Sequence, residues 1–421
     1  MGAKKTRRNG PSQHRLGRPV SRRGGRVAIL SHILPPAPSG QAAVLERLLR
    51  VWDPDEYCLI SAEPAPPDSQ DGAALPGHAY RVPTGCSLPV PRVARLRRLA
   101  SSANLLLRTV HRAAAITCIL HRESCQAIVA CTGDLIDLPA GYLAARWSGV
   151  PFYIHMFDDY ERQWVAPRAR CVAKRIMPHL MQRVEGVIVT NEFLRDEYIR
   201  RYGVEATVVR NPCNWPPPPL EEATPWPEDL SEIKIVYTGS IYGAQLNAFV
   251  DLIGALRKLG RSHIRLHVYT SQDPEELASH GISGPVDFHE HVSRDAVREI
   301  QRRSDLLFLP LAFDSPYEKG LIETSAPGKM AEYLASGRPT LVYAPPESFV
   351  AHYFREHGCG AVVDCRSVDD LSAKIGKLVD DGEYRERITQ SASERAVADF
   401  DLAKAQRVFR GALLGVRGRR I

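Results

Sequence analysis

The segment PGKMAEYLASGRPT, residues 327–340, places a cation and an anion where one helix face could present both. Lys329 and Glu332 are three residues apart, and residues at this spacing share one face of a helix. Pro327 is typical of a helix start, and Gly337 predicts an end just before it. An ammonium group beside the N–H groups of a helix start favours a diphosphate, and a carboxylate one turn further accepts hydrogen bonds from sugar hydroxyls. The pattern predicts a site for a nucleotide-sugar.

A run of small residues, Thr238-Gly239-Ser240, lies between a strand predicted at 233–237 and a helix predicted at 246–259. Small residues let backbone amides approach a phosphate, although a plain tight turn fits these residues equally well when they are taken alone. Because this is the first turn of the second half of the chain, a phosphate contact is favoured. No Lys or Arg follows until the last turn of the helix, so Lys329 is the candidate that neutralises the phosphate charge.

In the first half, His155 and Asp158 follow a strand predicted at 151–154. An imidazole or a carboxylate can deprotonate an acceptor hydroxyl near neutral pH when its surroundings tune its pKa. These two side chains are therefore candidate catalytic groups that point toward a cleft. A strand-end histidine and a helix-capping aspartate explain the same residues equally well.

The elements that must position these residues alternate between short apolar runs and helical patterns. The apolar runs occur at 27–30, 127–130, 151–154, 186–190, 233–237, 265–269, 305–309 and 340–343. Strands that alternate with helices predict an α/β fold with mostly parallel sheets. Prolines concentrate at 213–230, which predicts a stiff linker. We divide the chain into a basic disordered arm at 1–26, a first domain at 27–212, the linker at 213–230, a second domain at 231–395 and a C-terminal helical segment at 396–421.

Composition narrows the functional classes. The 421 residues carry a formal net charge of +7, but residues 1–26 hold nine basic side chains and no acid, which leaves the remainder near neutral. A near-neutral body without an aromatic and basic RNA-binding motif argues against nucleic acid as a partner. No segment reaches the length of a membrane-spanning helix. Nine cysteines without a C-x-x-C pair predict reduced thiols in a cytoplasm and no structural zinc.

The segment from Arg92 to Arg112 contains six arginines, no acid and several leucines. Such a helix can lie on an anionic membrane surface, and the N-terminal arm would strengthen that contact. A solvated basic face on a core-packed helix explains the segment equally well. Asp53-Pro54-Asp55 matches an Asp-x-Asp metal motif, but a proline between the acids predicts a turn, so we expect no metal site there.

Four motifs of the second domain occur in the order found in a known enzyme family. They are Tyr237-Thr238-Gly239-Ser240, His289-Glu290-His291-Val292, the run from Ser304 to Pro310, and the run from Pro327 to Pro339. This order resembles the donor half of GT-B glycosyltransferases of the family 4-like group over residues 233 to about 365. The first domain is similar more loosely, through 35–40, 149–152 with His155 and Asp158, and 209–212.

The resemblance implies two Rossmann-like, doubly wound domains that face each other across a cleft. It implies an NDP-sugar donor in the second domain, a saccharide or lipid-linked acceptor in the first, retention of anomeric configuration, no cofactor and no obligatory metal. The donor-binding candidates are Gly239, Ser240, Thr324, Ser325, Pro327, Gly328, Lys329 and Glu332, and the acceptor-side loop candidates are Ser39 and Gly40. We expect a cytoplasmic enzyme, peripheral on the inner face of the membrane, in cell-surface polysaccharide or glycoconjugate synthesis.

One departure from the family pattern leaves alternatives open. Many members carry two glutamates separated by seven residues, and Glu332 fits the second position while Thr324 occupies the first. Glu323 lies one place away. A nucleotide-sugar epimerase with the same fold, or a degenerate GT-B protein that only binds a partner, remain alternatives to a transferase.

Overall fold

The computed structural model describes residues 25–63, 74–83, 94–218 and 231–414, together with residues 85, 89, 226 and 227. Nearly all of the predicted basic arm at 1–26 and much of the linker at 213–230 lie outside the described residues. Residues 213–218 of the linker contain no helix or strand. Within the described part of the chain, no helix is both long and apolar enough to cross a membrane.

The first half of the chain forms a seven-stranded, fully parallel sheet with the order β3-β2-β1-β4-β5-β6-β7. Its strands are β1 (Val27–Leu30), β2 (Tyr57–Ser61), β3 (His78–Arg81), β4 (Ala127–Cys131), β5 (Phe152–Met156), β6 (Gly186–Val189) and β7 (Ala206–Val208). The strand order reverses between β1 and β4. In sheets of this kind, ligands bind beyond the carboxyl ends of the strands at such a switch point.

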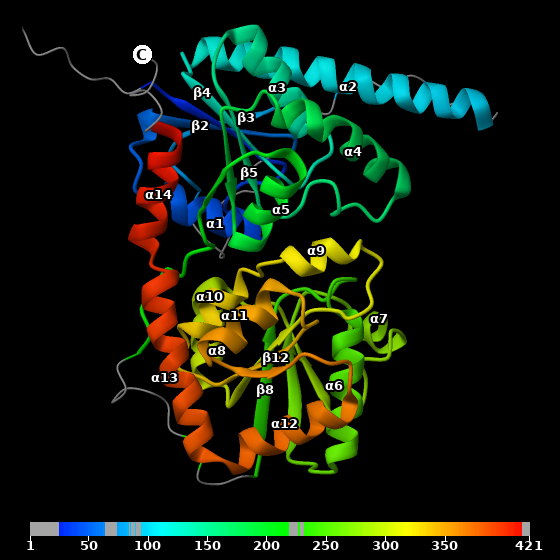
Figure 1. The fold of residues 1–421 in the computed structure, drawn as a ribbon, viewed down its shortest axis with the longest axis vertical. Helices are drawn as coiled ribbons and strands as arrows, with labels where there is room; N and C mark the ends of the chain where they lie inside the picture. Colours follow the sequence, from blue (N-terminus) through cyan, green and yellow to red (C-terminus); the bar gives the residue numbers. More distant parts are fainter. Residues whose placement is uncertain are drawn as a thin grey trace, which may run out of the picture.

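The second half forms a six-stranded parallel sheet with the order β10-β9-β8-β11-β12-β13. Its strands are β8 (Ile233–Thr238), β9 (Ile264–Tyr269), β10 (Val286–His289), β11 (Leu306–Pro310), β12 (Thr340–Tyr343) and β13 (Ala361–Val363). Figure 1 shows the two sheets in separate halves of the molecule, one above the other. The predicted pair of doubly wound α/β domains is confirmed.

Helices cover both faces of each sheet. In the first half they are α1 (Gly40–Leu49), α2 (Ala94–Arg122), α3 (Asp137–Ser148), α4 (Pro167–Met181) and α5 (Glu192–Tyr202). In the second half they are α6 (Leu246–Leu259), α7 (Pro274–Ser279), α8 (Arg294–Arg303), α9 (Lys319–Thr324), α10 (Lys329–Leu334), α11 (Phe349–His357), α12 (Val368–Asp380) and α13 (Gly382–Asp399). The last helix, α14 (Leu402–Leu414), follows α13.

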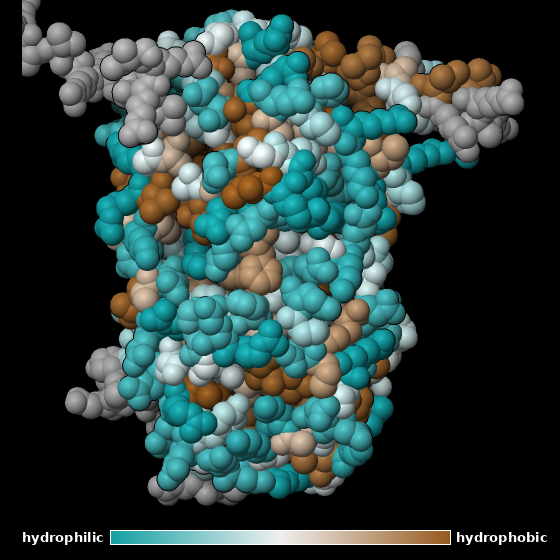
Figure 2. All heavy atoms as spheres, viewed as in Figure 1, coloured by the Kyte–Doolittle hydropathy of each residue, from teal (hydrophilic) through white to brown (hydrophobic). Residues whose placement is uncertain are grey.

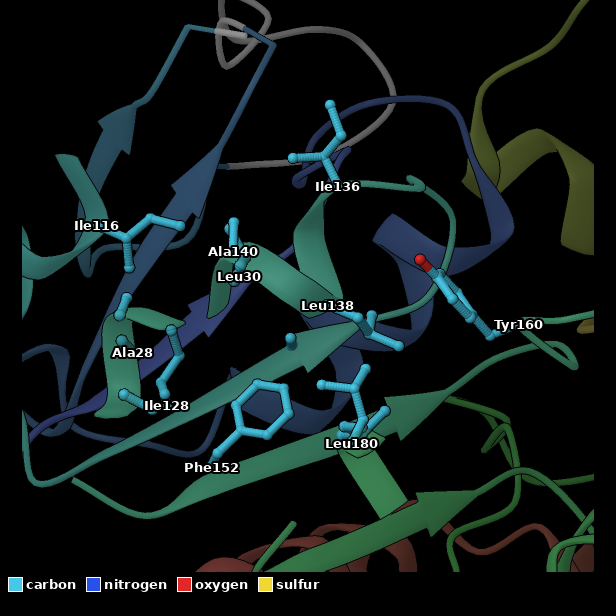
Figure 3. Packing of buried hydrophobic residues seen from close by; sticks show 14 of the residues in the cluster. Ala28, Leu30, Ile116, Ile128, Ile136, Leu138, Ala140, Phe152, Tyr160 and Leu180 are labelled. Atoms are coloured by element: carbon cyan, nitrogen blue, oxygen red, sulfur yellow. The ribbon is translucent and has the colours of Figure 1, made fainter. Parts of the chain in front are cut away.

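The period of two along each strand divides the core into layers. On β1, Ala28 and Leu30 face one cluster with α2, α3, α4 and α5, which Figure 3 shows in close view. Val27 and Ile29 face the opposite cluster with α1 and α14. The helix α14 therefore returns from the second half of the chain to cover the first sheet, and Figure 1 shows it beside α1.

Candidate functional site

Lys329 begins α10, and its ammonium group lies against the aromatic ring of Tyr237 at the end of β8. The Nζ atom is 4.8 Å from the ring centre, a cation–π distance. The side chain is half-buried, and burial lowers its pKa while the nearby carboxylate of Glu332 opposes this effect. The helix ends at Leu334, three residues before Gly337, which has a left-handed conformation with φ of +74°. Lys329 is thus a partly desolvated cation at the carboxyl edge of the second sheet.

Gly239 allows the ammonium group of Lys329 to approach the backbone. A Cβ atom at this position would lie 3.0 Å from Lys329 Nζ, and φ is +112°, a region that favours glycine. The N–H of Gly239 donates to the carbonyl of Tyr269 at 2.8 Å. That amide is engaged within the sheet, so the contact that Gly239 makes possible is with Lys329. Ser240, the next residue, is exposed.

The carboxylate of Glu332 is contacted from both domains. Arg47 on α1 donates through Nη2 to Oε1 at 2.7 Å, and Gln301 on α8 lies 3.4 Å from Oε2. Gln301 also donates to the hydroxyl of Thr238 at 3.2 Å. The Arg47 and Glu332 side chains are 11% and 16% exposed. Because a carboxylate has about four lone-pair positions, these two donors leave capacity for sugar hydroxyls.

The loop between α9 and α10 is held by two asparagines of the first half. Asn191 donates to the carbonyl of Thr324 at 2.8 Å, and Asn211 donates to the carbonyl of Ala326 at 2.9 Å. Thr324 itself is buried, and its hydroxyl donates to Gly320 within α9. Ser325, Pro327 and Gly328 are half-buried in the same loop. These four donor-binding candidates therefore lie in the segment that meets the first half of the chain.

Asp158 lies two residues beyond the end of β5. Burial, with a smaller contribution from Asp159, raises the pKa of Asp158 to about 6. The Asp158 charge in turn contributes to raising the pKa values of Tyr242 and Tyr317, which follow β8 and β11. The two tyrosine rings meet edge to face at 6.5 Å. A carboxyl group that titrates near neutral pH is thus close to donor-side residues.

His155 lies elsewhere, contrary to the expectation that its ring points into the cleft. Its side chain is buried, with Phe157 at 4.2 Å and Phe409 of α14 at 5.5 Å between ring centres. Burial lowers its pKa to about 3. The cause is strand alternation, because His155 shares a face of β5 with Tyr153, and α14 covers that face. In this conformation the imidazole is neutral and fully buried.

The acceptor-side loop residues Ser39 and Gly40 begin α1. Ser39 is the N-cap, and its hydroxyl accepts from Ala42 N–H at 3.2 Å. Gly40 faces open space, because a Cβ atom there would have no neighbour within 4 Å. The same loop contacts the second half through Arg294, which donates to the carbonyl of Ala37 at 3.0 Å. Ser39 therefore acts locally as a helix cap.

Two residues of this site, Arg47 and Gln301, are not predicted from the sequence. Arg47 lies within an ordinary amphipathic helix, and Gln301 lies in the last turn of the polar helix α8. Nothing in their local spacing indicates that they meet Glu332, because the contact joins residues more than 280 positions apart in one case. The only available signal was the doubly wound topology, which brings strand ends and the helices after them to one edge.

The Asp-x-Asp run makes structural contacts within the protein. Asp53 caps a short 3₁₀ turn at Pro54–Glu56, as the turn prediction requires, and Asp55 pairs with Arg26 at 2.5 Å. Within the described ranges, no group of three His, Cys, Asp or Glu side chains is arranged to hold a metal ion.

Comparisons with known proteins agree with this fold. Residues 232–395 match the family of glycosyl transferases group 1. Sucrose-phosphate synthase from Thermosynechococcus elongatus aligns with 93% of this chain and 100% of its own, at 13% identity and a TM-score of 0.65. HepE of Anabaena in complex with UDP-glucose aligns over 93% and 100%, at 14% identity and a TM-score of 0.64.

A third solved structure has the same arrangement. The lipopolysaccharide outer core galactosyltransferase WaaB, in its apo form, aligns over 93% of this chain and 99% of its own, at 14% identity and a TM-score of 0.57. A comparison with curated proteins finds no match. At such low identities the structural likeness shows the fold alone, two facing Rossmann-like domains of the GT-B type.

Proposed function

We propose that this chain, which has the GT-B fold and whose residues 232–395 match the glycosyl transferases group 1 family, moves a sugar from an NDP-sugar to a hydroxyl of a saccharide or lipid-linked acceptor. The observation that carries the proposal is the joint placement of Lys329, Gly239 and Glu332. A cation, a close-approach glycine and a carboxylate lie together at the carboxyl edge of the second sheet.

In the proposed transfer, the bond from the anomeric carbon to the diphosphate oxygen breaks, and a bond from that carbon to an acceptor oxygen forms. Lys329 stabilises the negative charge that develops on the departing diphosphate, which is where a preorganised cation contributes most. Its partly desolvated position strengthens that interaction relative to water. Glu332 accepts hydrogen bonds from the ribose. The family pattern favours retention of anomeric configuration.

Asp158 is the proposed group that receives the acceptor proton. A pKa of about 6 keeps it mostly ionised at neutral pH while leaving it basic enough to assist the transfer. Its proximity to Tyr242 and Tyr317 supports this role, because both tyrosines belong to the domain that is proposed to hold the donor. His155 is not included, because its ring is enclosed.

The acceptor is proposed to lie on the first domain, with the enzyme in the cytoplasm and peripheral on the inner membrane face. The pathway class is synthesis of a cell-surface polysaccharide or glycoconjugate. UDP is the first nucleotide to test, because the Anabaena HepE structures that resemble this chain contain UDP or UDP-glucose.

The test is calorimetric titration of the intact protein with UDP, GDP, dTDP and ADP, repeated on Lys329→Ala and Glu332→Ala. We expect selective binding of one nucleotide, weakened about tenfold or more by each substitution, because each removes a charge-assisted contact. Lys319→Ala is the matched control, since Lys319 is an exposed lysine of the same domain.

Two results would contradict the proposal. Absence of binding to every nucleotide would favour the degenerate, partner-binding alternative. Equal weakening by Lys319→Ala would show only a general effect of positive charge. If a nucleotide binds, incubation with the matching nucleotide-sugar separates the remaining reactions: release of the nucleotide without an acceptor indicates hydrolysis or epimerisation rather than transfer.

A further inference from the structure

The N-terminal part of α2 projects from the first domain. This helix runs from Ala94 to Arg122, and its C-terminal half is anchored by buried side chains such as Ile116 and Leu120. Arg112, also buried, pairs with Asp137 at 2.5 Å. From Leu96 to residue 103, by contrast, none of the described side chains is buried. Figure 1 shows this end of α2 extending beyond the body of the molecule.

The projecting part carries a stripe of exposed apolar side chains. The exposed fractions are 52% for Leu96, 69% for Leu99, 64% for Leu106, 47% for Leu107 and 41% for Val110. At 100° per residue these five positions fall within an arc of about 100°, and they extend over about 21 Å of helix. Figure 2 shows hydrophobic side chains gathered along this part of α2. Contiguous exposed apolar surface of this kind marks an interaction site.

The charge of α2 indicates which kind of partner fits the apolar stripe. From Ala94 to His111, α2 contains four arginines, one histidine and no acidic residue, whereas Arg112 is buried in its pair with Asp137. Arg97 and His111 are exposed, and together with Arg108 they occupy the flank next to the stripe at helical spacing. A second copy of the same helix would bring like charges together, which is unfavourable. An anionic lipid surface fits both kinds of side chain. Long arginine side chains can reach the polar headgroups while the leucines enter the acyl boundary.

We propose that the apolar stripe of α2, formed by Leu96, Leu99, Leu106, Leu107 and Val110, docks the first domain onto an anionic lipid bilayer, with the helix lying in the plane of the headgroups. The alternative of a basic face on a core-packed helix does not account for leucines whose side chains are half or more exposed. This contact goes beyond sugar transfer and requires no donor, but it would place the acceptor domain at the surface where lipid-linked sugars reside.

The test is sedimentation of the full chain with two kinds of vesicle, one of phosphatidylcholine alone and one of phosphatidylcholine mixed equally with phosphatidylglycerol. We expect binding to the anionic vesicles that weakens with salt, and little binding to the neutral ones. The double variant Leu99→Asp with Leu106→Asp should lower the partition coefficient about tenfold or more. Val397→Asp is the matched control, because Val397 is 62% exposed on α13 of the other domain.

Circular dichroism melting checks that each variant is folded. Substitutions at exposed positions usually change stability little, so we expect the variants to fold. Unchanged vesicle binding by the folded double variant would overturn the proposal. Binding that does not depend on phosphatidylglycerol would also overturn it. Analytical ultracentrifugation tests whether a second copy of the chain covers the stripe instead. If the native protein is a dimer and the double variant is a monomer, the stripe binds a second copy and not a lipid surface. Nucleotide titration is a separate readout, so failure here leaves the donor site unaffected.

Discussion

Arg47 of the first domain and Glu332 of the second form an ion pair of 2.7 Å at the position proposed for the donor ribose. Arg47 also donates through Nη1 to the carbonyl of Pro212 at 2.8 Å, where the linker begins. The preceding residue, Glu46, pairs with Arg294 of the second domain. Two adjacent residues of α1 therefore make interdomain ion pairs of opposite polarity. The carboxylate proposed to hold the ribose is thus linked to the relative orientation of the domains.

Arg47→Met should raise the dissociation constant of the donor nucleotide about tenfold, because Glu332 loses the cation that orients its carboxylate. It should also lower the free energy of unfolding by about 1.5–3 kcal/mol, the usual contribution of a hydrogen bond to a charged group. Urea denaturation and calorimetric titration measure the two effects. Lys258→Met, which removes an exposed pair with Asp369, should change stability by less than about 0.5 kcal/mol.

A double-mutant cycle decides whether Arg47 acts through Glu332. In the Glu332→Gln background, Arg47→Met should have a much smaller effect on nucleotide affinity, with a coupling energy of about 1 kcal/mol. Additive effects of the two substitutions would contradict the link between them.

Gly239→Ala should reduce both stability and nucleotide affinity. The alanine Cβ atom would lie 3.0 Å from Lys329 Nζ, at a φ of +112° that L-residues rarely adopt. We expect a cost of about 1–3 kcal/mol in unfolding free energy, since strained backbone positions cost that much. Gly411→Ala in α14 is the control: nothing lies within 4 Å of its Cβ position, so the change should stabilise the helix by up to about 1 kcal/mol. Thermal melts of both variants, with titration of the first, test the prediction.

Asp158→Asn should abolish most of the transferase activity without destabilising the protein. If Asp158 accepts the proton, kcat/KM in the native protein falls as pH drops below about 6, and the variant lacks that limb of the profile.

Ionisation of Asp158 should support activity but lower the free energy of unfolding. Its folded pKa of about 6 lies above the unfolded value near 3.9, so the native state binds more protons between these values and loses stability as pH rises through that window. At pH 7 the uncharged asparagine should therefore raise the free energy of unfolding by up to about 2 kcal/mol. A variant that is both inactive and less stable at pH 7 would point to a structural role.

Phe409→Ala should destabilise the first domain. Phe409 lies on α14 and is fully buried, with its ring centre 6.1 Å from Trp52 and 5.5 Å from His155. Removal of a buried phenylalanine ring costs about 3–5 kcal/mol, whereas Phe409→Leu should cost less than about 2 kcal/mol. Hydrogen exchange should show the loss of protection in α1 rather than in α6. Equal loss in both helices would contradict the assignment of α14 to the first domain.

The sequence predicts the elements better than it predicts their contacts. The helix expected at 246–259 has the observed bounds of α6, and the strand expected at 233–237 extends one residue further in β8. These segments succeed because strong local periodicity and clear turn residues agree. The strands β3, β7, β10 and β13 are not among the predicted runs, because three or four residues carry too little pattern.

The candidate site is predictable in part for the same reason. Lys329, Glu332 and Gly239 come together because Gly239 follows β8 and α10 lies in the connection after β11, a neighbouring strand, and the topology brings these strand ends to one edge. The burial of His155 was not predictable. The alternation of side chains along a strand assigns His155 to one face of the sheet, but it does not show which distant helix covers that face. Arg47 reaches Glu332 only through the packing of two domains, and no local spacing encodes that.

The return of α14 to the first sheet has a consequence for biosynthesis. Ala405, Phe409 and Leu413 complete the apolar layer over β1, β4 and β5, whose residues are made several hundred positions earlier. During translation this layer stays uncovered while the whole second domain emerges, and domains generally fold as units in the order of synthesis. The domain that is synthesised first is therefore completed last, and until then the nascent chain exposes a surface that chaperones can bind.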